Sequence, residues 1–235
     1  MRFTAIDIDT TGLSPLKEKI IEIGAVRYED GVQKAVLSTL VRPRIAALPV
    51  RITELTGITE EMLKNAPEEE EAMNSLFHFL EGETVLLGHN IPFDYSFLKT
   101  AAERMGAEFS YDGIDTLLLA RQCCPDLPSK TLAAMCEAYG IINAHAHRAC
   151  EDACAAAELY FCLLERFGKE QETAFVPKPL CYRPKKMEPV TGKQCRYLAS
   201  IIAAHGLELK PNYETMTKSE ASRLIDTLLA RYGRI

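Results

Sequence analysis

The sequence lacks any long apolar run, and this absence excludes several classes of protein. No stretch of 18 or more consecutive apolar residues occurs, so no transmembrane helix is predicted. The chain also opens on a strand-like segment, without the basic and then apolar regions of a secretory signal. We therefore expect a cytoplasmic protein that makes no membrane contact.

Paired cysteines are also absent. None of the eight cysteines forms a Cys-x-x-Cys pair, the spacing typical of zinc sites and redox motifs. Most of them lie in Ala- and Leu-rich segments of helical character, where a reduced thiol packs like a small apolar side chain. Reduced core thiols are the favoured interpretation, and a redox or metal role is the weaker alternative.

An overall excess of positive charge is missing as well, since the 235 residues carry a net charge of −6. The charge is unevenly distributed, however. Residues 181–235 contain ten Lys and Arg against five Asp and Glu, so this segment is at +5 and the rest of the chain at −11. This asymmetry indicates an acidic, metal-holding body with a basic arm that attracts phosphates.

Alternating strand and helix patterns predict an α/β fold with a mixed β-sheet flanked by α-helices. Three strands are expected at residues 2–9, 19–28 and 32–41, and the turn signal Glu29-Asp30-Gly31 makes them an antiparallel meander. A short apolar strand at residues 84–88 then precedes a helix, and a long Ala- and Leu-rich helix follows later in the chain. This arrangement resembles the ribonuclease H-like fold.

Composition divides the chain near its end. Residues 168–190 contain four prolines and several lysines, which predicts a semi-rigid linker. Residues 191–235 are expected to form a small helical module, in which Thr217-Lys218-Ser219-Glu220 is a capping box before an apolar stripe at helical spacing. We thus expect one large domain at residues 1–167, a linker, and this module.

Two acids end the first predicted strand. Asp7 and Asp9 are two residues apart, so they project from the same face of the strand, just before the polar turn Thr10-Thr11-Gly12. Paired carboxylates at the rim of a buried strand are suited to hard divalent cations such as Mg2+ or Mn2+. For an isolated Asp-x-Asp pair, a solvated surface strand is the simpler alternative.

Three further residues are placed where such a site needs them. Asp94 falls in the first turn of the helix after the strand at 84–88, at the sheet edge where clefts form. Asp152 lies near the start of the long helix. His147 is expected in the loop before it, because within one regular helix the two residues would point about 140° apart. Each acid alone also fits an ordinary helix start, where carboxylates favour the helix dipole.

The order of these acids, their contexts and the final His-x4-Asp spacing together resemble a known family. The chain is similar to the DEDD exonuclease superfamily in its histidine-bearing (DEDDh) branch, which includes the proofreading epsilon subunit of bacterial DNA polymerase III. The resemblance covers residues 1–167 and extends to the phrases Leu55-Thr56-Gly57-Ile58-Thr59 and Asp115-Thr116-Leu117.

The resemblance implies a metal-dependent 3'-to-5' exonuclease that removes nucleoside 5'-monophosphates from DNA. Asp7 is implied to contact two divalent ions, Mg2+ or Mn2+, with Asp9 and Asp152 on one of them. Asp94 is implied to reach the other ion, directly or through water. His147 is the implied general base, because an imidazole pKa near 6.5 suits proton transfer at neutral pH.

Substrate contacts follow from the same resemblance. It implies that Thr10, Thr11 and Gly12 position the terminal 3'-hydroxyl, that Leu13 and Phe93 contact bases, and that Asn90 orients the loop; core packing is the alternative for Phe93. In the basic module, which looks like a helical module attached to some bacterial nucleases and helicases, the candidate phosphate contacts are Lys185, Lys186, Lys193, Arg196 and Lys218. An ordinary solvated surface is the equal alternative for these five.

One position departs from the family pattern, which has Glu where this chain has Asp9. The missing methylene withdraws the carboxylate by about 1.5 Å, whereas a catalytic constellation tolerates about 0.5 Å. Backbone adjustment, a bridging water or the larger Mn2+ would compensate; otherwise cleavage is slow or lost. Two alternatives to a DNA exonuclease stay open. One is an exoribonuclease, since no motif reads the 2'-hydroxyl. The other is a protein that binds nucleic-acid ends without cutting, because Asp9 replaces the Glu of the family. Single-stranded DNA 3' ends and a DNA polymerase are the expected partners.

Overall fold

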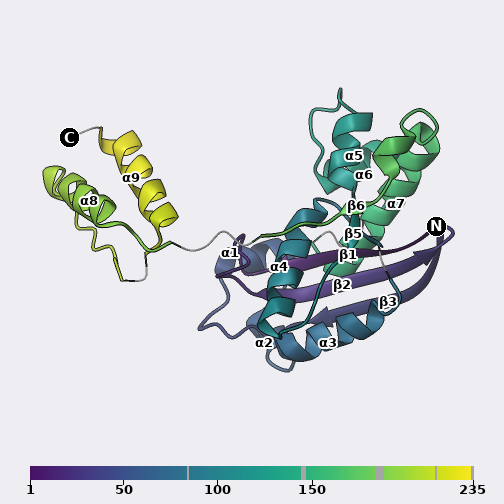
Figure 1. The fold of residues 1–235 in the computed structure, drawn as a ribbon, viewed down its shortest axis with the longest axis horizontal. Coiled ribbons are helices and arrows are strands. Elements are labelled where there is room, and N and C mark those ends of the chain that lie inside the picture. Colours follow the sequence, from purple (N-terminus) through teal and green to yellow (C-terminus); the bar gives the residue numbers. More distant parts are fainter. Residues whose placement is uncertain (84, 144–146, 184–187, 215, 234–235) are drawn as a thin grey trace. The chain divides into compact units, whose positions relative to one another are not determined.

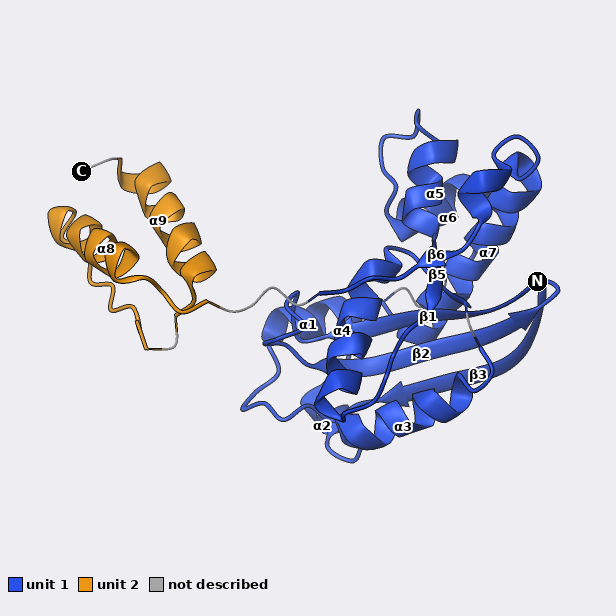
Figure 2. Cartoon of the chain, in the orientation of Figure 1, with its two compact units in different colours: residues 1–184 blue, residues 185–235 orange. Residues whose placement is uncertain are grey.

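The computed structural model describes residues 1–83, 85–143, 147–183, 188–214 and 216–233 (Figure 1). It consists of two compact units, Met1–Pro184 and Lys185–Ile235 (Figure 2). The expected division was a domain at residues 1–167, a linker at 168–190 and a module at 191–235. The structure instead divides the chain after Pro184.

A six-stranded mixed sheet forms the centre of the first unit, in the order β3-β2-β1-β4-β5-β6. The antiparallel meander is as predicted: β1 (Arg2–Thr10), β2 (Ile20–Glu29) and β3 (Val32–Leu40) pair in sequence. Asp30 and Gly31 both have positive φ angles, 50° and 80°, which makes the tight turn between β2 and β3. Next to β1, β4 (Val85–Gly88) and β5 (Asp112–Asp115) run parallel to it, and β6 (Lys178–Pro179) closes the edge.

Helices cover both faces of this sheet (Figure 1). One face packs against α3 (Glu69–Phe79) and α4 (Ile91–Arg104), and the other against α5 (Thr116–Cys123), α6 (Leu132–Tyr139) and α7 (Ala149–Phe167). The smaller helices are α1 (Val50–Thr56), which the sequence did not predict, α2 (Glu60–Leu63) and the 3-10 turn η1 (Glu172–Phe175). The predicted α/β fold is thus confirmed.

The side-chain alternation of β1 decides which helix faces its acids. Ile6 and Ile8 point into the core that contains α4, whereas Phe3 and Ala5 point into the core that contains α7. Because successive side chains of a strand point to opposite faces, Asp7 and Asp9 share the face of Phe3 and Ala5. The acids of the first strand therefore project toward the helix that carries Asp152.

The segment expected to be a linker packs onto the first unit for most of its length. Phe175 is buried in the core beside α7, and Lys178–Pro179 pairs with β5. The Leu180 N–H donates to the Tyr111 carbonyl at 2.9 Å, and its side chain fills the space above Gly113. Prolines alone did not distinguish a spacer from an edge strand, a position where proline is tolerated.

The second unit is a pair of helices, α8 (Gly192–Ala204) and α9 (Lys218–Tyr232). Thr191 with Gln194 and Thr217 with Glu220 form capping boxes at the two helix starts, the second as predicted. Their apolar faces pack against each other through a small cluster: Leu198, Ile201, Ile225 and Leu228.

The eight cysteines are free thiols. Cys123 and Cys136 are fully buried, and Cys181 is exposed. Among the described residues, no helix is both long enough and apolar enough to span a membrane.

Candidate catalytic site

The site is built where the end of β1 meets the start of α7. In the β1–β2 register, Asp7 lies opposite Gly24 and Asp9 lies opposite Glu22. A Cβ atom on Gly24 would lie 2.3 Å from main-chain atoms of Ala149 and Cys150, so only glycine lets α7 approach β2 this closely. The close approach brings the first turn of α7, and with it Asp152, to the face of Asp7 and Asp9.

Asp94 reaches the same site from the opposite helix layer. It lies in the first turn of α4, as predicted, and its side chain is 3% exposed. Its Oδ1 accepts a hydrogen bond from the main-chain N–H of Ile8 at 3.0 Å, between the two acids of β1. The turn before α4 is tight, since a Cβ on Gly88 would lie 2.9 Å from Cδ1 of Ile91, the first residue of α4.

Asp152 and His147 are arranged as predicted, with the aspartate on α7 and the histidine before it. Asp152 Oδ2 accepts the His147 main-chain N–H at 3.1 Å, and its Oδ1 accepts the Asn143 side-chain N–H at 2.6 Å. His147 has a left-handed φ of 69° and an exposed side chain. The Asp152 carboxylate thus fixes the main chain of His147, while the imidazole faces solvent.

Burial and neighbouring charges raise the pKa values of three of these acids. The pKa of Asp7 is raised well above its ordinary value by burial first, and then by the charges of Asp94, Asp152, Asp9 and Glu22. Burial and the neighbouring Glu22 carboxylate raise the pKa of Asp9 to about 8, and burial raises that of Asp94 to about 8. The charges act on one another because carboxylates from three distant segments of the chain lie close together. A bound cation would reduce the repulsion between them.

The donor set fits a hard divalent cation. Carboxylate oxygens are the ligands that Mg2+ and Mn2+ prefer, and Asp9 Oδ2 is buried without a hydrogen-bond partner among the described residues. Within the described residues, however, no three His, Cys, Asp or Glu side chains are already arranged to hold an ion.

The turn after Asp9 is held together by its own side chains. Thr10 Oγ1 donates to the Gly12 carbonyl at 2.7 Å, and Thr11 Oγ1 donates to Glu18 Oε2 at 2.7 Å. The Thr11 hydroxyl also accepts the Lys19 N–H at 2.9 Å. Leu13, at the tip, is 86% exposed, so it is free to contact a ligand.

The other predicted contacts are placed less directly. Phe93 is half-buried and packs on Phe97, with ring centroids 5.1 Å apart, so it belongs largely to the core. Asn90 has a left-handed φ of 72° and starts α4; its main-chain N–H, rather than its side chain, bonds Asp115 Oδ1 at 2.9 Å.

In the second unit, Lys193 and Arg196 are exposed on α8, whereas Lys218 pairs with Glu188 at 2.8 Å. Lys185 and Lys186 lie outside the described residues.

Three residues at the site were missed by sequence reasoning: Asn143, Glu22 and Arg148. Glu22 interrupts the apolar run Ile20-Ile21-Glu22-Ile23 at the start of β2, and an acid in such a run is the signal that could have identified it.

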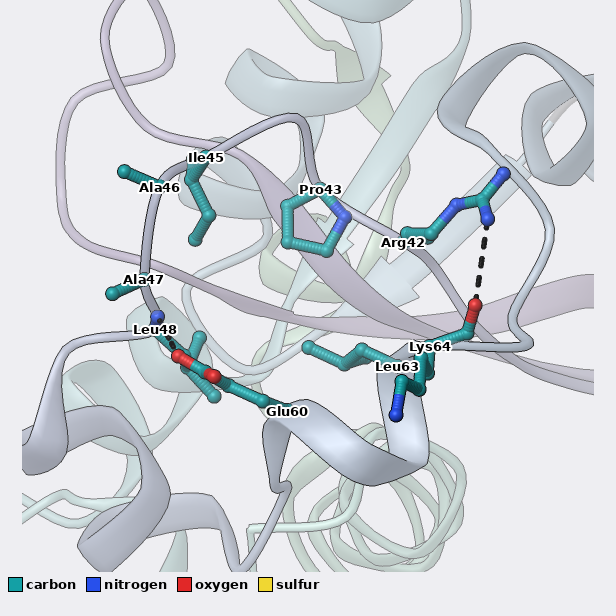
Figure 3. Close-up of a pocket in the computed structure, with 9 residues that line it drawn as sticks. All are labelled: Arg42, Pro43, Ile45, Ala46, Ala47, Leu48, Glu60, Leu63 and Lys64. Carbon is teal, nitrogen blue, oxygen red and sulfur yellow. Dashed lines mark hydrogen bonds between the residues drawn. The ribbon is translucent and has the colours of Figure 1, made fainter.

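A cavity of about 160 Å³ lies elsewhere in the first unit (Figure 3). It is lined by Arg42, Pro43, Ile45, Ala46, Ala47, Leu48, Glu60, Leu63 and Lys64. The Leu48 N–H donates to Glu60 Oε1 at 2.8 Å across it. None of the clustered aspartates lines this cavity, so we assign it no part in the chemistry.

Known proteins are similar to this chain in sequence and in fold. Residues 4–160 match the exonuclease family model RNase_T. The chain is 40% identical to a PolC-type DNA polymerase III of Caldanaerobacter subterraneus over 70% of its length, and 35% identical to the DNA polymerase III subunit epsilon of Aquifex aeolicus over 69%. The match spans 12% of the PolC-type protein and 80% of the epsilon subunit.

Two solved structures illustrate the likeness in three dimensions. Exonuclease X in complex with 5'-overhanging duplex DNA aligns with a TM-score of 0.59 and 26% identity, over 71% of this chain and 93% of that one. Escherichia coli Exonuclease I with an oligo-dT strand aligns with a TM-score of 0.67 and 19% identity, over 73% and 43%. The resemblance found in the sequence is confirmed: this chain belongs to the exonuclease family.

Proposed function

We propose that the chain is a divalent-metal-dependent 3'-to-5' exonuclease that shortens DNA and releases nucleoside 5'-monophosphates. The observation that carries this proposal is the convergence of Asp7, Asp9, Asp94 and Asp152 beside His147, where burial and neighbouring charges raise the pKa values of the first three. A relative named as an epsilon subunit, matched over most of its length, supports DNA as the substrate and a DNA polymerase as a partner.

The clustering of the four acids supports a role for each of them. Two divalent ions, Mg2+ or Mn2+, would be held by Asp7, with Asp9 and Asp152 as further ligands of one ion and Asp94 as a further ligand of the other. When bound, the ions supply Lewis acidity and lower the pKa of water at the scissile phosphate. The exposed imidazole of His147 would take the proton from the attacking water, a role that histidine often has in general acid–base catalysis.

The turn after β1 is the proposed seat of the terminal nucleotide. The hydroxyls of Thr10 and Thr11 are engaged within the turn, so they shape it rather than bind substrate directly. Gly12 leaves room beside the Glu18 side chain, where a Cβ would lie 2.8 Å from Glu18 Cδ. Leu13, exposed at the tip, is the residue we expect to touch a base, and Phe93 supports α4 from within.

A direct test is digestion of matched single-stranded DNA and RNA oligonucleotides with Mg2+ or Mn2+. We expect mononucleotides from DNA at a higher rate than from RNA, and no product with a chelator. RNA degraded faster than DNA would favour the exoribonuclease alternative. Binding of both strands with no product under either metal would favour an end-binding protein and would contradict the enzyme.

The shortened acid of the first motif gives a gain-of-function prediction. We expect Asp9→Glu to raise kcat roughly tenfold, because displacements of about 1 Å at a reacting centre cost up to about 10²-fold. Single-turnover digestion measures the change, and Asp126→Glu, an exposed acid in the loop before α6, is the matched control. A lower kcat in Asp9→Glu than in the wild type would mean that the site is adapted to the shorter side chain.

The second unit is the proposed accessory phosphate-binding surface. Lys193 and Arg196 are exposed and on one helix, while Lys218 is already paired with Glu188 and contributes less. We expect the Lys193→Gln/Arg196→Gln double variant to bind single-stranded DNA more weakly and to flatten the slope of log K against log salt by about 1.4, two single-strand phosphate contacts. Fluorescence anisotropy across salt concentrations measures both.

Lys169→Gln, an exposed lysine just after α7, is the control for that measurement. If the double variant keeps the wild-type slope, the basic residues of α8 form an ordinary solvated surface.

A further inference from the structure

A fifth carboxylate lies against the four acids of the proposed site. Glu22 is the third residue of β2, and only 1% of its surface is exposed. It lies directly opposite Asp9 in the antiparallel register, on the face that α7 covers. Its charge raises the pKa of both Asp7 and Asp9, so by itself it adds to the repulsion in this region.

Glu22 is held by a dense set of hydrogen bonds from the start of α7. Arg148, the residue before the helix, donates from Nη2 to Oε1 at 2.7 Å and from Nε to both oxygens at 3.1–3.2 Å. The main-chain N–H of Ala149 donates to Oε2 at 3.1 Å. One carboxylate therefore binds both a side chain and a free N–H of the first helical turn.

These bonds act on the segment that carries two proposed catalytic groups. Arg148 directly follows His147, and Ala149 lies less than one turn before Asp152. Two residues further along the same face of β2, Gly24 lets the α7 main chain pack directly on the strand. Glu22 thus fixes the helix start laterally while Gly24 sets its distance from the sheet.

Stability alone does not account for this arrangement. A buried ion pair contributes little net stability, because desolvation offsets the attraction between the charges. Here one member also lies among four other carboxylates, where its charge is unfavourable. A geometric role for the pair explains why an acid interrupts the apolar run at residues 20–26 of β2.

We propose that Glu22 and Arg148 are a positioning pair that fixes the start of α7, so that Asp152 and His147 face Asp7 and Asp9. The inference rests on the proposed exonuclease function. Neither residue needs to touch substrate or metal for this role. In metal sites, groups that orient the ligands in this way typically change metal affinity or activity 10–100-fold when removed.

The test compares Glu22→Gln, Arg148→Gln and the double variant in the full chain. Two readouts are used: Mn2+ affinity by calorimetry, which needs no turnover, and kcat and KM for a DNA oligonucleotide. We expect each single variant to weaken Mn2+ binding and lower kcat by about tenfold with KM within twofold. The double variant should be no worse than the worse single, because both residues act through one contact.

The two single variants change the charge in opposite directions, which separates geometry from electrostatics. A purely electrostatic role would make Glu22→Gln bind Mn2+ more weakly and Arg148→Gln more tightly. Positioning predicts weaker binding in both. Arg148 is partly exposed, so Arg148→Gln provides a folded variant even if Glu22→Gln melts early.

The matched control is a second bidentate pair in the same unit, Glu69 with Arg104, whose bonds are 2.7–3.1 Å long. Glu69→Gln is expected to leave Mn2+ affinity and kcat unchanged. Wild-type Mn2+ affinity and kcat in Glu22→Gln, tighter Mn2+ binding in Arg148→Gln, or an equal defect in Glu69→Gln would each overturn the positioning pair.

The outcome for the positioning pair can be separated from that for the proposed function. If the wild type binds Mn2+ through Asp7 but releases no nucleotides, the exonuclease proposal fails while the Mn2+ titrations still decide the role of Glu22 and Arg148. If the wild type binds no Mn2+, both proposals fail.

Discussion

Replacing Asp7 with asparagine is expected to reduce nucleotide release by about 10³-fold or more, since a bound metal supplies several kcal/mol to the transition state and 1.36 kcal/mol corresponds to tenfold in rate. Asp7 interacts electrostatically with all the other acids of the site, so its replacement affects the whole cluster. Asparagine keeps the shape of the side chain and removes its charge. Single-turnover digestion at saturating Mn2+ measures the loss.

Asp112→Asn, an exposed acid at the start of β5, is the matched control and should keep wild-type activity. An Asp7→Asn variant within tenfold of the wild type would contradict a bridging role for Asp7.

Asp7→Asn is expected to stabilise the metal-free protein. The raised pKa values at the site predict how this stabilisation depends on pH. Asp7, Asp9 and Asp94 all have pKa values raised above 3.8 in the folded state, the latter two to about 8. At pH values between about 4 and about 8, the folded protein holds protons that the unfolded chain has released. The free energy of unfolding therefore falls as the pH rises through this range. Asp7→Asn removes one such group and relieves the others.

Melting with a chelator at pH 5 and pH 8 measures this effect. We expect Asp7→Asn to melt above the wild type at pH 8, with a smaller difference at pH 5. A gain of 1 kcal/mol corresponds to about 2–4 °C for a chain of this size. A lower melting temperature than the wild type at pH 8 would mean that Asp7 is not under electrostatic stress in the metal-free fold.

Replacing His147 with alanine is the second large effect, an expected loss of about 10²–10⁴-fold in kcat, the range for removal of a general base. The imidazole is exposed, and its main chain is bonded to Asp152, so the substitution should leave the carboxylates in place. Mn2+ affinity is therefore expected to stay within twofold. The acidic limb of the wild-type pH–kcat profile, which a general base produces, should disappear.

His78→Ala, an exposed histidine at the end of α3, is the control for that variant. Equal loss of Mn2+ affinity and kcat in His147→Ala would instead identify the imidazole as a metal ligand.

Much of the fold could be predicted from local patterns. The three strands of the meander differ from their expected bounds by a residue or two, because alternating apolar residues and the Asp30-Gly31 turn specify them locally. The position of Asp94 in the first turn of α4 followed from the short strand before it, and that of His147 before α7 followed from helix geometry. These features depend on a few neighbouring residues.

The remaining features depend on contacts between distant segments, which one sequence does not reveal. Glu22 and Arg148 are separated by 126 positions in the chain, and Lys178–Pro179 becomes a strand only because β5 offers it an edge. The sequence leaves Phe93 open between a base contact and core packing, because its packing on Phe97 is not visible in the motif. Asp9, which the sequence marks as the departure from the family, proves to be the neighbour of Glu22.

The direction of digestion tests the central proposal most directly. Single-stranded DNA labelled at its 5' end is incubated with the wild-type chain and Mn2+, and the products are resolved at single-nucleotide steps. We expect a ladder of labelled fragments that shortens one nucleotide at a time from the 3' end, together with nucleoside 5'-monophosphates, and no ladder with a chelator. Release of the 5' label as the first product, or an intact strand under both Mg2+ and Mn2+, would contradict a metal-dependent 3'-to-5' exonuclease.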